Sequence, residues 1–143
     1  MKKIFLAMVM VLAPIFLNLH SVPGYAAYGI SIDQGKFNAV PYITGGVGLN
    51  ERAVMRGMAD HYNVRLVFAT LSGAYLANVE VLIQDGNGRR LFQGNSNGPW
   101  FFFDLPKGQY KITATHAGKK ETRGVALVKP FDTVVFNWKI NKL

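Results

Sequence analysis

The chain has 143 residues, a formal net charge of +8 and no cysteine. Without cysteine it has no disulfide, no thiolate metal ligand, no cysteine nucleophile and no cysteine that could carry a lipid anchor. No run of basic residues is longer than two. We therefore interpret the positive charge as dispersed over solvent-facing side chains, and we expect no nucleic-acid partner.

Residues 1–26 have the pattern of a secretory signal peptide. Lys2 and Lys3 form a positive start, residues 4–19 are almost entirely apolar, and Gly24 and Ala26 are small residues at the positions that signal peptidase reads. The apolar stretch is short for a membrane span of about 20 residues, so we expect cleavage after Ala26. Removing 26 of the 143 residues leaves 117, and losing the two lysines lowers the net charge from +8 to +6. The expected product is periplasmic or secreted, with no transmembrane segment.

Residues 27–62 are predicted to be a leader that ends in one short helix. Residues 28–33 are compatible with a short strand, and the sequence DQGK at residues 33–36 indicates a turn. A helix is expected over residues 50–61, because Asn50 can cap its first turn and apolar side chains then recur at helical spacing. These apolar side chains are Val54, Met55, Met58 and Ala59.

From residue 63 onward the apolar period changes to two, which is typical of strands that bury one face. Seven short strands are expected, over residues 64–69, 79–84, 89–93, 100–104, 110–115, 125–128 and 133–138. The clearest turn signals between them are DGNG at residues 85–88 and LPKG at residues 105–108. The side chains expected to point inward are Val64, Leu66, Phe68, Val79, Val81, Ile83, Tyr110, Ile112, Val134, Phe136 and Trp138. The pattern predicts a single all-β, antiparallel β-sandwich over residues 63–143.

One hairpin resembles a known family. The sequence LPKGQYKITATHAG at residues 105–118 resembles the signature hairpin of carboxypeptidase regulatory-like domains, which are transthyretin-like β-sandwiches with Greek-key connections. The matching residues are Leu105, Pro106, Gly108, Tyr110, Ala114 and Gly118, with Val79 and the turn at residues 85–88 upstream. The segment from Tyr42 to Ala69, followed by such a sandwich, is similar to a group of small exported bacterial proteins. The resemblance implies a seven-stranded Greek-key sandwich and an exported location, but no activity.

The sequence WFFF at residues 100–103 admits two interpretations. Side chains alternate along a strand, so Trp100 and Phe102 share one face, while Phe101 and Phe103 share the other. If one face is exposed, Trp100, Phe101 and Phe103 are candidates for a surface that binds a glycan ring or an apolar partner. If the helix covers the outer face, the strand is buried on both faces. We favour this second arrangement, because covering large aromatic rings is strongly stabilising.

Two basic pairs, Arg89–Arg90 and Lys119–Lys120, lie near predicted hairpin ends. All four residues are candidates for a rim that contacts an anionic polymer or a protein partner. The same residues fit the protection of strand edges by charge, which we favour.

No catalytic, cofactor-binding or metal-binding residue is expected. The glycine-rich segment at residues 45–48 lacks the Lys-Ser/Thr pair of a phosphate-binding loop. His61 and His116 have no second ligand at metal-site spacing. Hydroxyisourate hydrolases have a related sandwich, but the C-terminal sequence WKINKL departs from their Tyr-Arg-Gly-Ser type of tail.

The residues leave three hypotheses for function. The leading one is a non-catalytic binding or accessory module of the bacterial cell envelope, which recognises a protein partner through an edge strand or hairpin loops. The alternative is a carbohydrate-binding module that holds a polysaccharide on exposed aromatics such as Phe101 or Phe103. The remote alternative is a hydroxyisourate-hydrolase-like enzyme, which requires His61 or His116 to meet arginine side chains in a cleft.

Overall fold

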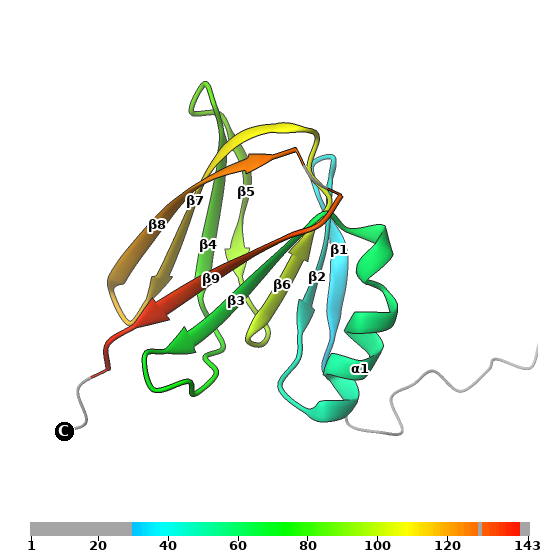
Figure 1. Cartoon of the computed structure of the whole chain (residues 1–143), viewed down its shortest axis with the longest axis vertical. Coiled ribbons are helices and arrows are strands. Elements are labelled where there is room, and N and C mark those ends of the chain that lie inside the picture. Colours follow the sequence, from blue (N-terminus) through cyan, green and yellow to red (C-terminus); the bar gives the residue numbers. More distant parts are fainter. Residues whose placement is uncertain (1–29, 129, 141–143) are drawn as a thin grey trace, which may run out of the picture.

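The computed structural model describes residues 30–128 and 130–140, which form two β-sheets and one α-helix (Figure 1). The expected signal peptide at residues 1–26 lies outside the described residues. One sheet has five strands in the order β1-β2-β6-β3-β9, and the other has four in the order β5-β4-β7-β8. The prediction of an all-β sandwich is confirmed, but the predicted count of seven strands is wrong, because the described chain has nine.

The elements follow one another in a simple order. They are β1 (Asp33–Phe37), β2 (Val40–Gly45), α1 (Leu49–Gly57), the 3₁₀ turn η2 (Ala59–His61), β3 (Val64–Thr70), β4 (Glu80–Asp85), β5 (Arg90–Asn95), β6 (Trp100–Phe103), β7 (Gly108–His116), β8 (Lys119–Leu127) and β9 (Asp132–Trp138).

The two additional strands, β1 and β2, come from the segment that was expected to be a leader. The predicted turn at residues 33–36 is wrong, since these residues belong to β1. The chain turns instead at Asn38, whose φ of 53° is one that asparagine tolerates better than most residues. Beyond this turn β2 pairs with β6, so the segment before the helix is an integral part of the five-stranded sheet.

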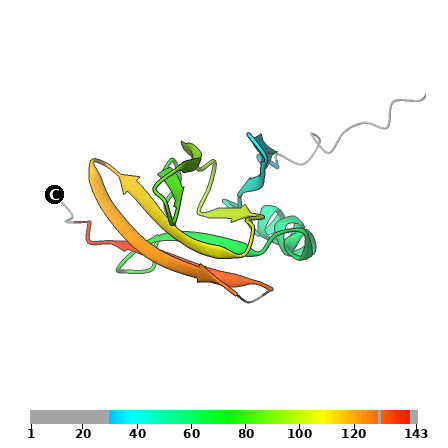
Figure 2. The same ribbon diagram turned by 90° about the horizontal axis from the view of Figure 1, so that it is seen from above.

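The last strand, β9, pairs with β3 in parallel, from Val64 opposite Asp132 to Thr70 opposite Trp138. The expectation of a wholly antiparallel sandwich is therefore wrong at this pair. The reason is that β8 belongs to the four-stranded sheet while β9 belongs to the five-stranded one. The chain crosses from one sheet to the other between them, and Figure 2 shows it leaving β8 and returning as β9.

The main core lies between the two sheets, and the inward side chains expected from the alternation are confirmed almost throughout. Val64, Leu66 and Phe68 of β3 are fully buried. Val134 is the exception, since it is only partly buried against this core. Trp138 anchors β9 as expected and donates a hydrogen bond from Nε1 to the backbone oxygen of Lys119, 3.0 Å away.

The helix α1 is shorter than expected and begins one residue earlier. Gly48 occupies the N-cap position instead of Asn50. The side chain of Glu51 accepts hydrogen bonds from the nearby backbone N–H groups of Gly46 and Val47. Met55 is fully buried, whereas Val54, which was expected on the apolar stripe, is 40% exposed. No helix among the described residues is long and apolar enough to cross a membrane.

Candidate functional site

The aromatic strand β6 is buried on both of its faces. Phe101 and Phe103 are 1% and 0% exposed and lie in the main core, while Phe102 is 0% and Trp100 is 5% exposed. The hypothesis of an aromatic binding surface formed by Trp100, Phe101 and Phe103 is thereby corrected, because none of these rings is accessible to a ligand. The arrangement with a strand covered on both faces is the one observed.

A second, smaller core explains how the outer face of β6 is covered. Met55 of α1 and Tyr62, which follows η2, pack with Phe102, Trp100 and Ile43. Figure 1 shows α1 standing beside β2 and β1 at one side of the molecule. The Tyr62 hydroxyl accepts a hydrogen bond from Nε2 of Gln34, 3.1 Å away, which joins this small core to β1.

Three arginine side chains lie on aromatic rings, and two of them share the ring of Trp100, which belongs to this second core. The guanidinium carbons of Arg56 and Arg65 are 5.4 Å and 5.3 Å from the centroid of the same ring, that of Trp100. Arg65 is also 5.6 Å from the ring centroid of Phe131. Arg52, one turn before Arg56 on the helix, lies 5.4 Å from the ring centroid of Tyr75. We call Arg52, Arg56 and Arg65 the arginine surface.

The arginine surface was not recognised in the sequence. Two signals were available, namely the four-residue spacing of Arg52 and Arg56 on a predicted helix and the outward position of Arg65 between the inward residues Val64 and Leu66. These signals are weak individually. They become significant only when α1 is seen to lie against the face of the sheet from which Arg65 projects.

The two basic pairs predicted as a rim are exposed and lie on different hairpins. Arg89 precedes β5 and makes an ion pair with Asp85, with Nε and Oδ2 3.4 Å apart, and Arg90 donates to Oε1 of Gln93 at 2.7 Å. Lys119 and Lys120 begin β8 after the tight turn at Ala117 and Gly118. Neither pair belongs to the arginine surface, whose residues come from α1 and β3.

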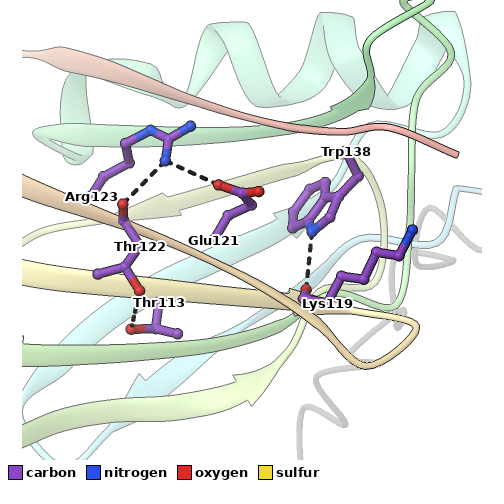
Figure 3. Close-up of polar contacts among 6 residues, drawn as sticks. All are labelled: Thr113, Lys119, Glu121, Thr122, Arg123 and Trp138. Atoms are coloured by element: carbon purple, nitrogen blue, oxygen red, sulfur yellow. Dashed lines mark hydrogen bonds and ion pairs between the residues drawn. The ribbon is translucent and has the colours of Figure 1, made fainter.

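The strand β8 is an edge strand, because it pairs only with β7. Its first half is protected in several ways (Figure 3). The Trp138 indole donates to the oxygen of Lys119, and Nη1 of Arg123 donates to the backbone oxygen of Thr122 at 3.1 Å. Arg123 also pairs with Glu121, with Nη1 and Oε2 3.3 Å apart. Charged side chains of this kind discourage pairing with another strand.

The second half of β8 differs in its chemistry. Residues 124–127, with the sequence GVAL, carry no charge, and no described side chain donates a hydrogen bond to their backbone. Val128, which follows directly, is 73% exposed. Next to Gly124 lies a hollow of ≈ 250 Å³, bordered by Gln109, Tyr110, Val125 and Ala126. We call residues 124–127 the open edge.

The two histidines within the described part of the chain lie far apart. His61 is in η2, just before the start of β3, whereas the ring of His116 is 5.9 Å from that of Trp138, at the end of β9. Because β3 and β9 run parallel, roughly 20 Å of strand separates these ends. A hollow of ≈ 250 Å³ beside His116 is bordered by Ala117, Lys119, Trp138 and Ile140, so it contains no arginine. The described residues include no group of three His, Cys, Asp or Glu that could hold a metal ion.

Compared with models of protein families and with curated proteins, the chain matches none. The fold itself is a β-sandwich of two sheets, with one helix covering the outer face of the five-stranded sheet.

Proposed function

We propose that the mature chain is a non-catalytic binding module of the bacterial cell envelope, which acts through protein–protein contacts made by the open edge of β8. The proposal includes export by the segment of residues 1–26 and a sandwich of the carboxypeptidase regulatory-like kind with Greek-key connections. The resemblance of residues 105–118 to that family and the two-sheet architecture support it.

The observation that carries this proposal is the contrast between the two halves of β8. An edge strand leaves about half of its backbone N–H and C=O groups without a neighbour, and proteins usually protect them with lysine or inward-pointing charges. Residues 119–123 have this protection, in the form of Lys119, Lys120 and the Arg123–Glu121 pair. Residues 124–127 lack it and end beside the exposed Val128.

An extended segment of a partner would bind here by strand addition, in which backbone hydrogen bonds give affinity and pockets for alternate side chains give specificity. The hollow beside Gly124 is placed to receive one such side chain. A Cβ atom added to Gly124 meets no atom within 4 Å, so the space above this residue is open. The carbohydrate alternative has no support, because the rings on which it depended are buried.

The proposal is tested with two variants that add the same charge two residues apart on one face of β8. Gly124→Lys fills the hollow and charges the open edge, whereas Thr122→Lys changes the half that is already protected. Each mature variant, residues 27–143, is used to capture proteins from envelope extract, with binding to insoluble peptidoglycan and polysaccharides measured in parallel. We expect Gly124→Lys to lose a specific protein that wild type and Thr122→Lys retain.

Hydrogen exchange on the isolated complex locates the contact independently. The amides of residues 124–127 that point away from β7 should exchange more slowly when the partner is bound. Retention of the partner by Gly124→Lys, or binding to polysaccharide with no protein captured, would contradict the proposal. Thermal unfolding of both variants establishes that each is folded.

A further inference from the structure

The arginine surface holds three guanidinium groups in fixed positions outside the main core. Arg56 and Arg65 both lie on the Trp100 ring, so the separation of their guanidinium carbons cannot exceed the two ring distances combined, 5.4 Å and 5.3 Å. Trp100 itself is held by the second core, where its ring stacks on that of Phe102 with centroids 5.8 Å apart. Arg56 and Arg65 are therefore oriented by a rigid part of the protein. Arg52 is held differently, because its Nη1 donates hydrogen bonds to the backbone oxygens of Gly46 and Val47, 2.6 Å and 3.0 Å away.

The stacked arginines retain hydrogen-bond donors. Stacking uses the flat faces of a guanidinium and leaves the N–H groups at its rim available. Among the described residues, none accepts a hydrogen bond from Arg56, which is exposed. Arg65 makes one long hydrogen bond, 3.3 Å from Nη2 to Oγ1 of Thr133, and its Nη1 remains available, whereas its Nε is buried.

No carboxylate of the described chain neutralises these groups. The two ion pairs found there join Arg89 to Asp85 and Arg123 to Glu121, and neither involves the arginine surface. Asp60 is four residues beyond Arg56 but makes no ion pair with it within 4.0 Å. Glu51, adjacent to Arg52 in sequence, is occupied by the backbone N–H groups of Ser31, Gly46 and Val47. The charges of Arg56 and Arg65 are therefore not compensated by any ion pair among the described residues.

We propose that the arginine surface is a binding site for the phosphate groups of a polyanionic polymer. The hollows beside His116 and Gly124 do not include these arginines, and Arg56 is exposed on the surface of the helix. A polymer lying along this surface therefore fits it better than an enclosed small molecule. Each phosphate inside such a chain has two non-bridging oxygens for one guanidinium fork, and the next phosphate along the chain carries a second charge that the other arginine can bind. A nucleic acid fits less well, because the Trp100 ring is too buried to stack on bases.

The test uses inorganic polyphosphate as the probe and compares two variants of equal net charge. Arg56→Gln/Arg65→Gln removes two charges from the arginine surface, and Arg89→Gln/Arg90→Gln removes two from the β4–β5 hairpin. We expect the first pair to weaken polyphosphate binding about tenfold or more, because charge-assisted hydrogen bonds are lost, and the second to change it no more than about twofold. Binding is measured by calorimetry at low and moderate salt on the mature chain.

A conservative variant separates geometry from charge. Arg56→Lys/Arg65→Lys keeps both charges but lacks the planar fork, so its affinity should fall clearly below that of wild type. This variant also provides a second measurement if Arg65→Gln weakens folding, because the arginine contacts Trp100 and Phe131. Thermal unfolding is recorded for every variant.

Four outcomes would overturn the assignment. They are no binding of polyphosphate by wild type at low salt, equal losses in the two glutamine pairs, full affinity in the lysine pair, and tighter binding of polyglutamate or single-stranded DNA than of polyphosphate. The inference is independent of the open edge, since Gly124→Lys should leave polyphosphate binding unreduced. If partner binding by the open edge fails its test, phosphate binding by the arginine surface can still hold, and the reverse is also true.

Discussion

The carboxylate of Glu51 accepts a hydrogen bond from the backbone N–H of Ser31, 2.9 Å away, across 20 residues of chain. Its other oxygen accepts from the N–H groups of Gly46 and Val47, at 2.9 Å and 3.0 Å. One buried side chain thus joins the segment before β1, the end of β2 and the first turn of α1. This junction holds the helix against the sheet and so fixes the position of Arg52 and Arg56.

We expect Glu51→Ala to lower the free energy of unfolding by about 3 kcal/mol, because three backbone donors lose their acceptor in a place with little water. Asn50→Ala is the matched control, since Asn50 lies in the same turn but is exposed; its cost should stay below about 0.5 kcal/mol. Denaturant unfolding measures both values. Equal costs for the two variants would show that the Glu51 hydrogen bonds contribute little.

Phe101→Ala and Phe102→Ala should each cost about 3–5 kcal/mol, as is usual for a buried phenylalanine. They should differ in where protection from hydrogen exchange is lost. Phe102 lies in the second core, so its loss should first increase exchange of the α1 amides. Phe101 lies between the sheets, so its loss should affect both sheets. Identical exchange patterns in the two variants would contradict the division into two cores.

Gly98→Ala should be strongly destabilising, by about 2 kcal/mol or more, because its Cβ would lie 2.3 Å from the backbone oxygen of Gly45. Backbone atoms cannot move aside as a flexible side chain can. Gly124→Ala is the control, since an added Cβ there meets no atom within 4 Å. Its stability should be close to that of wild type in thermal unfolding. If Gly98→Ala were as stable as wild type, β2 and the loop before β6 would be less closely packed than described.

The pKa of Tyr110 is raised by its burial and, to a smaller extent, by the charge of Asp85. Burial likewise raises the pKa of Tyr42 and Tyr62. A raised pKa means that the folded state favours the neutral phenol. The stabilisation is therefore complete below about pH 10, the ordinary tyrosine value, and is lost as the pH rises through the folded pKa.

Tyr110→Phe tests this pH dependence. At neutral pH the variant should lose about 1 kcal/mol, because the Tyr110 hydroxyl no longer donates to the backbone oxygen of Pro106. Between pH 9 and about 11 its stability should decline less steeply than that of wild type, since one ionising group has been removed. Unfolding by denaturant at a series of pH values measures both effects. Parallel declines in the two proteins would contradict the role of Tyr110.

The strands that could be predicted are those with one face in the core. In β3 the inward residues Val64, Leu66 and Phe68 alternate with outward ones, and this alternation records burial directly. The strand β1 could not be predicted in the same way. It is an exposed edge strand whose residues include Asp33, Gln34 and Gly35, so its sequence resembles a turn more than a strand.

The start of β8 was missed for a related reason. Its positions that face the opposite sheet include Glu121 and Arg123, which close the side of the sandwich with charged side chains instead of apolar ones. The arginine surface was missed because its members come from α1 and β3, whereas the ring that two of them share comes from β6. No local pattern states that a helix will lie across a particular strand.

The parallel pairing of β3 with β9 has a consequence for how the protein folds. Arg65 and Thr133, which meet across this pair, are 68 residues apart in the sequence. The flank of β3 therefore stays uncovered until the residues up to Trp138 are available, and closing so long a loop is slow on the scale of local hairpins. The hairpins β4–β5 and β7–β8 need no such wait. We expect them to form early and the five-stranded sheet to be completed in the last and slowest step.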